Sequence, residues 1–170
     1  LIPPQFANSN VDLPALPAEA YRLVTDRETY GIMDIGGDDR GAYALGRYVP
    51  GILQENNYRM IFVANASRPL TRTPEDALEV MREIEAACGL RFTDLVNNTN
   101  LGDLTTAETV LASQEYMEKL SELSGLPIFA TTAKADVAAQ LPLPNVLPLQ
   151  LQEKYFDLPS QKPGNRPLWG

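Results

Sequence analysis

Tyr30-Gly31-Ile32-Met33-Asp34-Ile35-Gly36-Gly37-Asp38-Asp39 is the stretch that decides the expected fold of this 170-residue chain. It is a short apolar run that reaches an aspartate, with two glycines close behind. A run this short, with glycine and aspartate after it, suits a buried parallel strand over residues 30–35 better than a helix. Asp34 would then lie at the carboxyl end of that strand, which is where open α/β sheets bind ligands.

Further along the chain, short apolar runs alternate with helical patterns. We predict strands over residues 60–64, 92–96 and 127–130, and helices over residues 18–25, 39–54, 74–88 and about 106–123. Pro50 should kink or split the second helix, and Gly89 and Gly125 should end the last two. This alternation predicts an α/β fold, a parallel sheet with crossover helices. Residues 1–136 would form the domain, and residues 137–170 a proline-rich, irregular tail.

Composition narrows the classes of function. The net charge of −8 argues against a nucleic-acid-binding surface. A single cysteine excludes an internal disulfide and a cysteine-cluster metal site, and the absence of histidine excludes histidine-based catalysis within this chain. The sequence has no signal peptide and no apolar run of membrane-spanning length, so we expect a cytoplasmic protein without a membrane anchor.

The acidic and glycine-rich end of the first run is the first candidate site. A carboxylate at Asp34 can hold a hydrated Mg²⁺, and the backbone at Gly36 and Gly37 can approach a phosphate closely. Asp38 would lie on a loop that senses a terminal phosphate. The alternative is structural: Asp34 ends a turn, and Asp38 or Asp39 caps the next helix.

Polar side chains follow the other predicted strands. Asn97, Asn98 and Asn100 follow the third strand, and a carboxamide can pair with the edge of an adenine because it both donates and accepts hydrogen bonds. Asparagines also occupy left-handed turn positions, so at least one of the three should be structural. Arg68 follows the second strand and could reach a phosphate or a carboxylate. Thr131, with Thr132, Lys134 and Asp136 after it, could border a base or ribose, or form a polar loop.

In their order and spacing, these segments resemble the ParA/MinD-like branch of P-loop ATPases, from about Ile2 to Thr132. Residues 30–37 look like the Walker B and switch II segment of that family, and residues 94–98 look like its adenine-contacting segment. The resemblance implies that Asp34 binds Mg²⁺ through water, that the amide of Gly37 faces the γ-phosphate, and that Asn98 contacts adenine.

The resemblance implies a switch ATPase that binds ATP and Mg²⁺ and hydrolyses ATP. Its catalytic residues would be Asp34 and Asp38; Gly36, Gly37, Asn98 and Thr131 would bind the nucleotide, and Asp34 the metal. In that family ATP commonly drives a homodimer, and a partner protein is the other expected contact. No C-x-x-C motif is present, so the iron–sulfur sub-branches are not indicated. The tail also lacks the basic amphipathic helix with which MinD-type proteins bind membranes.

One motif of the family is missing. No Walker A loop, G-x-x-x-x-G-K-[ST], occurs in the sequence, and the chain starts at Leu1. We interpret it as a fragment carrying a partial P-loop fold, although processing would also explain the start. We therefore expect the chain alone to bind ATP weakly or not at all. The sheet should also lack its central strand, between residues 30–35 and 60–64.

Two other functions remain open. Some P-loop relatives are ATP-dependent synthetases that activate a carboxylate, and Arg68 or Arg47 would then hold the substrate. A receiver-like domain would place Asp34 near Asp38, with Lys134 as the basic partner, but it needs a close acid pair at a neighbouring strand end that the sequence does not offer.

Overall fold

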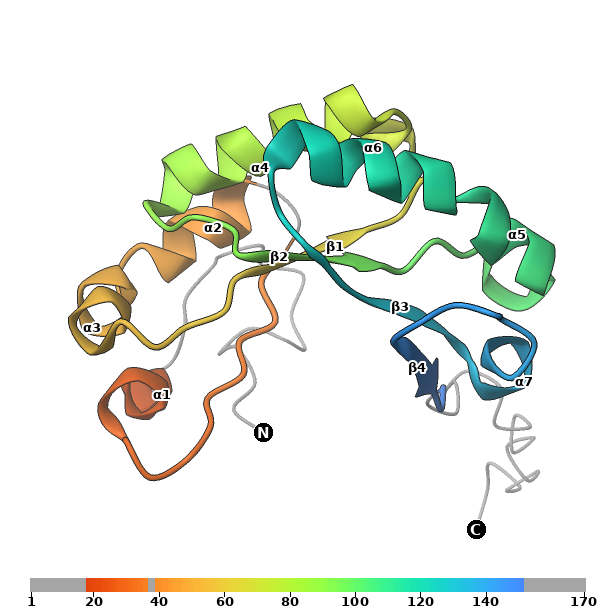
Figure 1. The fold of residues 1–170 in the computed structure, drawn as a ribbon. Helices are drawn as coiled ribbons and strands as arrows, with labels where there is room; N and C mark the ends of the chain where they lie inside the picture. Colours follow the sequence, from red (N-terminus) through yellow and green to blue (C-terminus); the bar gives the residue numbers. More distant parts are fainter. Residues whose placement is uncertain (1–17, 37–38, 152–170) are drawn as a thin grey trace, which may run out of the picture.

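A four-stranded parallel sheet lies at the centre of the protein (Figure 1). The computed structural model describes residues 18–36 and 39–151. The strands pair in the order β1-β2-β3-β4 and are β1 (Ile61–Ala64), β2 (Asp94–Asn97), β3 (Ile128–Lys134) and β4 (Val146–Leu149). The predicted α/β fold with a parallel sheet is thereby confirmed.

Helices precede the sheet and connect its strands. The α-helices are α1 (Arg22–Thr25), α2 (Asp39–Leu45), α3 (Val49–Glu55), α4 (Pro74–Cys88), α5 (Ala107–Ala112), α6 (Gln114–Ser124) and α7 (Ala135–Ala138). Short 3-10 turns are η1 (Ala18–Tyr21), η2 (Pro69–Thr71) and η3 (Gly102–Leu104). In Figure 1, α4 and α6 lie side by side on one face of the sheet. None of these helices is both long and apolar enough to cross a membrane.

Local signals fix the ends of the longest helix. The hydroxyl oxygen of Thr73 accepts a hydrogen bond from the amide of Asp76, whose carboxylate accepts one from the amide of Thr73 in return. Pro74 occupies the first helical turn, where its missing N–H costs nothing. Gly89 ends the helix with φ of 79°, a left-handed conformation that glycine adopts without strain. The predicted bounds of this helix are confirmed.

The helix predicted over residues 39–54 is split, as its proline indicates. α2 ends at Leu45, and a turn over residues 46–48 separates it from α3. Pro50 lies in the first turn of α3, where it is tolerated, so the break comes just before the proline.

The main core lies between the sheet and the helices above it. Phe62 of β1 and Leu95 of β2 are paired in register and point to the same face, where Met81 of α4 and Leu120 of α6 cover them. Phe62 also meets the ring of Phe92 edge-on at 5.3 Å between centroids. This packing fixes the face on which the helices lie.

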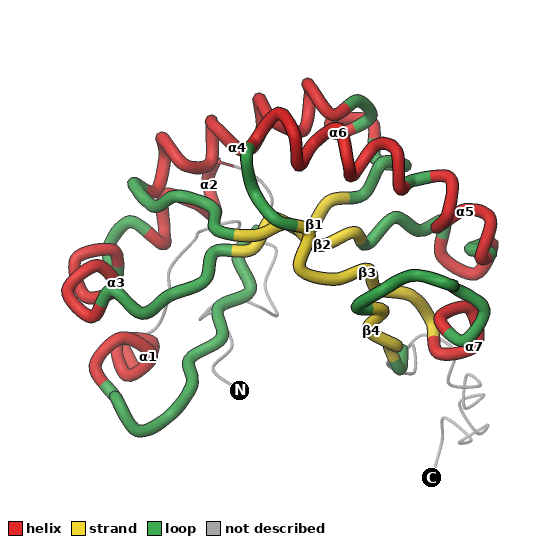
Figure 2. The backbone as a smooth tube through the Cα atoms, in the orientation of Figure 1, coloured by secondary structure: helices red, strands yellow, loops and turns green. Residues whose placement is uncertain are grey.

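The prediction of a strand over residues 30–35 is wrong. Residues 31–36 are extended but form no strand (Figure 2), and no described segment pairs with them. Met33 and Ile35 pack against the main core, whereas Ile32 and Asp34 on the opposite side are exposed. The alternation of a strand is thus present, but a strand needs a neighbouring backbone to pair with, and the segment has none among the described residues.

The described part of the predicted tail, up to residue 151, contains regular structure. β3 continues to Lys134 instead of ending at residue 130, and α7 and β4 follow it. The sequence does not indicate β4 (Val146–Leu149), because Pro144 and Asn145 directly precede the strand and Pro148 lies inside it. It pairs with the second half of β3 at the edge of the sheet, where a proline is tolerated. Residues 1–17 and 152–170 lie outside the described part of the chain.

Candidate functional site

Hydrogen-bonding side chains gather at the carboxyl ends of β1, β2 and β3. Asn97, the last residue of β2, is fully buried. Its carboxamide nitrogen donates to the hydroxyl of Ser113 at 2.8 Å, and its carboxamide oxygen accepts from the amide of Thr99 at 3.0 Å. Both ends of this carboxamide are therefore used to hold the loop after β2 against the start of α6.

A second contact joins this loop to the one after β1. The hydroxyl of Thr99 accepts a hydrogen bond from the amide of Ala66 at 3.1 Å, and the amide of Asn98 donates to the carbonyl of Ala64 at 2.8 Å. The two loops thus form one rim, and Asn98 is held by its backbone at the middle of that rim.

The side chain of Asn98 is oriented from the neighbouring strand. The hydroxyl of Thr132 in β3 lies 2.8 Å from Oδ1 of Asn98 and 3.2 Å from the carbonyl of Asn97. A threonine hydroxyl has one proton, so the shorter contact takes it. The amide nitrogen Nδ2 of Asn98 then has two N–H donors left for other partners, and Oδ1 has a second lone pair left. Asn98 is half-buried, so this donor and acceptor pair can meet a ligand.

The third asparagine is structural. Oδ1 of Asn100 accepts from the amide of Gly102, and its Nδ2 donates to the carbonyl of Asn98, which is a turn motif. The carboxamides of Asn97 and Asn100 therefore both have structural hydrogen-bond partners. This agrees with the expectation from the sequence that at least one of the three asparagines is structural. Of these three asparagines, Asn98 is the one whose carboxamide nitrogen has no hydrogen-bond partner among the described residues.

Thr131 does not lie where the sequence placed it. It is a buried residue within β3, aligned with Asn97 on one side and Val146 on the other, and is not part of a loop. Its neighbour Thr132 carries the hydroxyl that reaches Asn98. The error follows from the early end assigned to β3.

Two basic residues border the same edge. Arg68 is exposed four residues after the end of β1, at the start of η2, and forms no ion pair within the described residues. Lys134 ends β3 and pairs with Asp103, with 2.7 Å between Nζ and Oδ1. Lys134 is thus engaged in the loop after β2 and is not held by the residue 34 segment, as a receiver-like site would require.

The acidic segment reaches the core from outside the sheet. Asp34 and Gly36 are exposed on the segment 31–36, whereas Gly37 and Asp38 lie outside the described part of the chain. Gly31 passes so close to α1 that an added Cβ would be 2.9 Å from the carbonyl oxygen of Leu23. At the other end, a Cβ on Gly41 would be 3.0 Å from the carbonyl oxygen of Gly36. The glycines therefore allow the segment to fit between two helices.

The described residues suit Mg²⁺ only when a single carboxylate binds it and waters and phosphates supply the other ligands. Within residues 18–36 and 39–151, no group of three or more histidine, cysteine, aspartate and glutamate side chains comes together to hold a metal. Mg²⁺ is commonly held by one or two carboxylates, with waters and substrate phosphates completing the shell. The exposed carboxylate of Asp34 fits that role, and a metal cage made of protein ligands alone does not.

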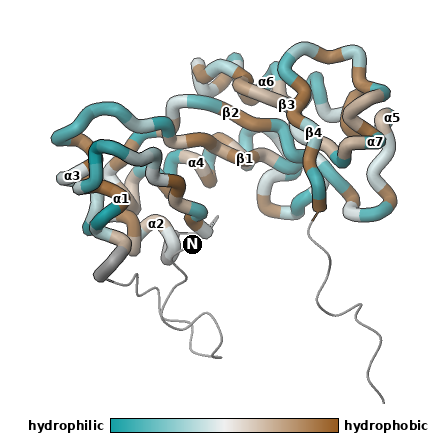
Figure 3. Tube along the Cα trace, turned by 90° about the horizontal axis from the view of Figure 1, so that it is seen from below, coloured by the Kyte–Doolittle hydropathy of each residue, from teal (hydrophilic) through white to brown (hydrophobic). Residues whose placement is uncertain are grey.

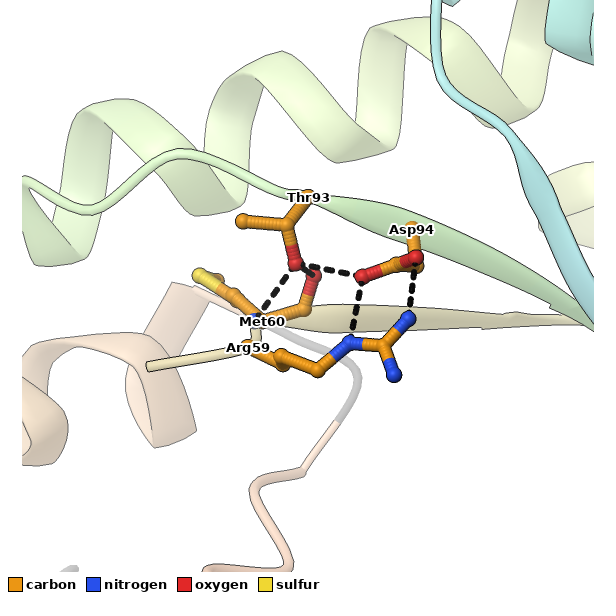
Figure 4. A network of polar contacts seen from close by, with 4 residues as sticks. All are labelled: Arg59, Met60, Thr93 and Asp94. Carbon is orange, nitrogen blue, oxygen red and sulfur yellow. Dashed lines mark hydrogen bonds and ion pairs between the residues drawn. The ribbon is translucent and has the colours of Figure 1, made fainter. Parts of the chain in front are cut away.

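A separate polar network joins the amino-terminal ends of β1 and β2, at the end of the strands opposite to the candidate site (Figure 4). The guanidinium of Arg59 donates through both Nε and Nη2 to the carboxylate of Asp94, with 3.0 Å from Nε to Oδ2. Thr93 also donates to Asp94 and accepts from the amide of Met60. Arg59 holds the pKa of the Asp94 carboxyl below its ordinary value of 3.8, against the effect of burial. The guanidinium also lies 4.1 Å from the ring centroid of Phe129. This network joins the amino ends of β1 and β2, so it is structural and away from the candidate site.

Sequence reasoning missed the partners that position Asn98. The sequence predicts one continuous helix through Ser113, but the structure ends α5 at Ala112 and begins α6 at Gln114, with Ser113 between them. The polar run Asn97–Asn100 was visible, but which asparagine stays open depends on contacts from residues 16 and 34 positions away.

Comparisons with protein-family models, with curated proteins and with solved structures found no match to this chain.

Proposed function

We propose that this chain contributes the adenine-binding and magnesium-binding parts of a site that binds and hydrolyses ATP, in the manner of a ParA/MinD-like switch ATPase. The observation that carries the proposal is the carboxamide of Asn98, which stands at the carboxyl end of β2, is oriented by Thr132 and keeps open donors. In parallel α/β sheets this edge is the usual place for a nucleotide.

The chemistry of Asn98 fits adenine. Its Nδ2 donors match a ring nitrogen acceptor of adenine, and the second lone pair on Oδ1 matches the 6-amino group. Guanine presents a carbonyl and a ring N–H at the corresponding edge, so it would oppose donor to donor and acceptor to acceptor. Asn98 should therefore favour ATP over GTP.

The metal and the phosphates need further groups. Asp34 would hold Mg²⁺ through its water shell, and the exposed backbone at Gly36 would lie near the phosphates. Mg²⁺ would offset negative charge that develops during phosphoryl transfer to water. The sequence has no G-K-[ST] loop to cradle the phosphates, so in this proposal that loop belongs to polypeptide beyond these 170 residues.

Amide chemical shifts test the proposal on the chain as it is. Contacts to the base without a phosphate cradle give weak binding, with a Kd of about 1 mM, which NMR titration detects. ATP should shift the side-chain amide signals of Asn98 and the backbone signal of Thr132, and GTP at the same concentration should not. Asn98→Ala should remove the response. Asn57→Ala is the matched control, because Asn57 is exposed and lies on the far side of β1 from this edge.

The two nucleotides also supply the contradicting results. Equal shifts with ATP and GTP, or no shift at Asn98 with either, would remove Asn98 from base recognition and with it the main support for an ATP site.

A carboxylate-activating synthetase is the second candidate, and the exposed Arg68 beside the same edge favours it. Product analysis separates the two functions in the complete enzyme. Phosphate released without a second substrate supports the switch ATPase, whereas release that requires a carboxylate supports the synthetase.

A further inference from the structure

A second, smaller apolar core lies at one end of the molecule. Its buried side chains come from α5, β3, α7 and the segment after α7, and are Val110, Ala133, Val137 and Leu141. They pack together apart from the main core. Figures 1 and 3 show α5, α7 and β4 gathered at this end of the molecule. We refer to α5 and residues 132–149 as the C-terminal unit.

The elements of this unit depend on their shared core. α5 has six residues and α7 has four, and helices this short are not stable on their own in water. The strand of the unit, β4, pairs with β3 and lies at the edge of the sheet. Each element therefore loses its support when the shared core opens, so the unit should form and open as a whole.

β3 connects the unit to the rest of the protein and is divided between the two cores. Its first residue, Ile128, packs against the main core, whereas Ala133 lies in the second core. Between them, Phe129 is an extra residue in β3, at a register shift after Leu95 of β2. Such a bulge bends the strand that carries it. β3 therefore bends where it passes from one core to the other.

The pairing of β3 changes near the same boundary. β2 ends at Asn97, which is aligned with Thr131. From Thr132 to Lys134, β3 is aligned with β4 only. Opening of the unit would therefore break the pairing of β3 with β4 and leave the pairing of β2 with β3 in place.

The helical layer divides at this boundary too. α5 packs in the second core, whereas α6 packs on the main core through Met117 and Leu120. Ser113 separates the two helices, and its hydroxyl accepts a hydrogen bond from Asn97, the last residue of β2. The break between the helices therefore lies beside the point at which β3 leaves β2, and the boundary of the unit passes through both layers.

The candidate site lies on this boundary. The amide of Asn98 donates to Ala64 of the main sheet, whereas the hydroxyl that orients its side chain comes from Thr132 of the unit. A hydrogen bond of this kind contributes little net stability, because water replaces it when the unit opens. The orientation of the Asn98 carboxamide thus depends on the C-terminal unit, although Asn98 itself lies outside it.

We infer that the C-terminal unit opens by local unfolding while the main core stays folded, and that this opening switches the carboxamide of Asn98 from a fixed to a free orientation. The small apolar core and short helices of the unit place it at the low-stability end of the molecule. A ligand that needs the fixed carboxamide binds the closed form better and so favours it. That last step rests on the proposed function, whereas the opening itself does not.

Hydrogen exchange of the purified chain, without nucleotide, tests the opening. The amide of Val110 is bonded within the first turn of α5, and the amide of Thr131 donates to the carbonyl of Asn145, directly before β4. After correction for intrinsic rates, both should exchange at the same rate. That rate should be about 100-fold faster than the rate of the Leu95 amide, which donates to the carbonyl of Pro127 within the main sheet.

Two results of this measurement would overturn the inference. Exchange of all three amides at one rate would mean that the unit opens only when the whole chain unfolds. Different rates for Val110 and Thr131 would mean that α5 and β4 open separately and form no common unit.

A matched pair of core variants adds a second measurement. Ile84→Val removes a methylene group from the main core, which stays packed in the opened form. It should speed the exchange of Leu95 about fivefold and leave the two amides of the unit unchanged. Val137→Ala shortens a side chain in the core of the unit and should speed all three amides about tenfold. If Ile84→Val speeds all three alike, the two cores open together and the inference is wrong.

The exchange measurements and the ATP titration can fail independently. Because no nucleotide is added here, equal exchange of the three amides would leave the titration of Asn98 unaffected. A titration in which Asn98 does not respond would likewise leave the measured opening of the unit unaffected.

Discussion

The segments 31–36 and 94–100 carry the same kind of sequence signal and end differently in the fold. Both are short apolar runs that reach polar residues, and both were predicted as buried strands with a ligand-binding end. Asp94–Asn97 forms β2, with β1 and β3 on either side, whereas residues 31–36 lie extended and unpaired. The comparison teaches that an apolar run specifies one buried side, but that only neighbouring backbone makes it a strand.

The largest expected difference between the two segments is in stability. Asn97→Ala should lower the free energy of unfolding by about 3 kcal/mol, because it leaves the buried partners Ser113 and Thr99 with lost hydrogen bonds. Urea unfolding followed by circular dichroism measures this loss. Asn57→Ala is the control and should change stability by less than about 0.5 kcal/mol. A loss that small for Asn97→Ala would mean that the rim is not held as described.

A glycine tests how residues 31–36 are anchored. Gly31→Ala would place a Cβ 2.9 Å from the carbonyl oxygen of Leu23, so α1 or the segment must move. We expect a loss of about 1–3 kcal/mol in the same unfolding experiment. Ile32→Ala, one residue on but exposed, should cost less than about 0.5 kcal/mol. Equal effects of the two changes would show that this segment is not packed against α1.

The acid dependence of stability tests the start of β2. The pKa of Asp94 is lower in the folded protein than its ordinary value of 3.8, so the unfolded chain binds the proton first as pH falls. The stabilisation is complete above about pH 4 and is lost as pH falls further, through the folded pKa. Asp94→Asn should therefore flatten the fall in stability between about pH 4 and pH 2. An unchanged slope would remove the pairing with Arg59 as its cause.

Much of the fold could be predicted because its signals are local. The caps at Thr73 and Gly89 and the split near Pro50 depend on residues within a turn of one another. The strand over residues 30–35 failed because pairing depends on a neighbour that the run itself does not encode. The opposite error occurred at β4, where the sequence predicts no strand. This proline-rich segment is a strand because its backbone pairs with the edge of β3.

The candidate site was predictable in kind but not in detail. The polar run after β2 indicated a site at the strand ends, yet Asn98 differs from Asn97 only in which distant side chains contact it. The sequence predicts Thr131 as the ligand-facing threonine in place of Thr132, because it does not show that β3 extends to Lys134. Strand length and side-chain partners are tertiary properties, so local patterns do not fix them.

The smallest expected effect on stability is at the exposed acid. Asp34→Asn should change the free energy of unfolding by less than about 0.5 kcal/mol, because the side chain is exposed and has no hydrogen bond within the described residues. The same urea experiment measures it. A loss of more than 1 kcal/mol, by the same scale, would give Asp34 a structural role in place of a metal-binding one.

The central claim is that both segments serve one nucleotide, and Mn²⁺ in place of Mg²⁺ tests it most directly. In the presence of ATP, Mn²⁺ should broaden the amide signals of Asp34 and Gly36, while the side-chain amide of Asn98 shifts. Asp34→Asn should weaken the broadening and leave the shift, because the metal then keeps only its phosphate and water ligands and the base contact does not need the metal. Broadening that is the same without ATP, or that is unchanged by Asp34→Asn, would contradict the account.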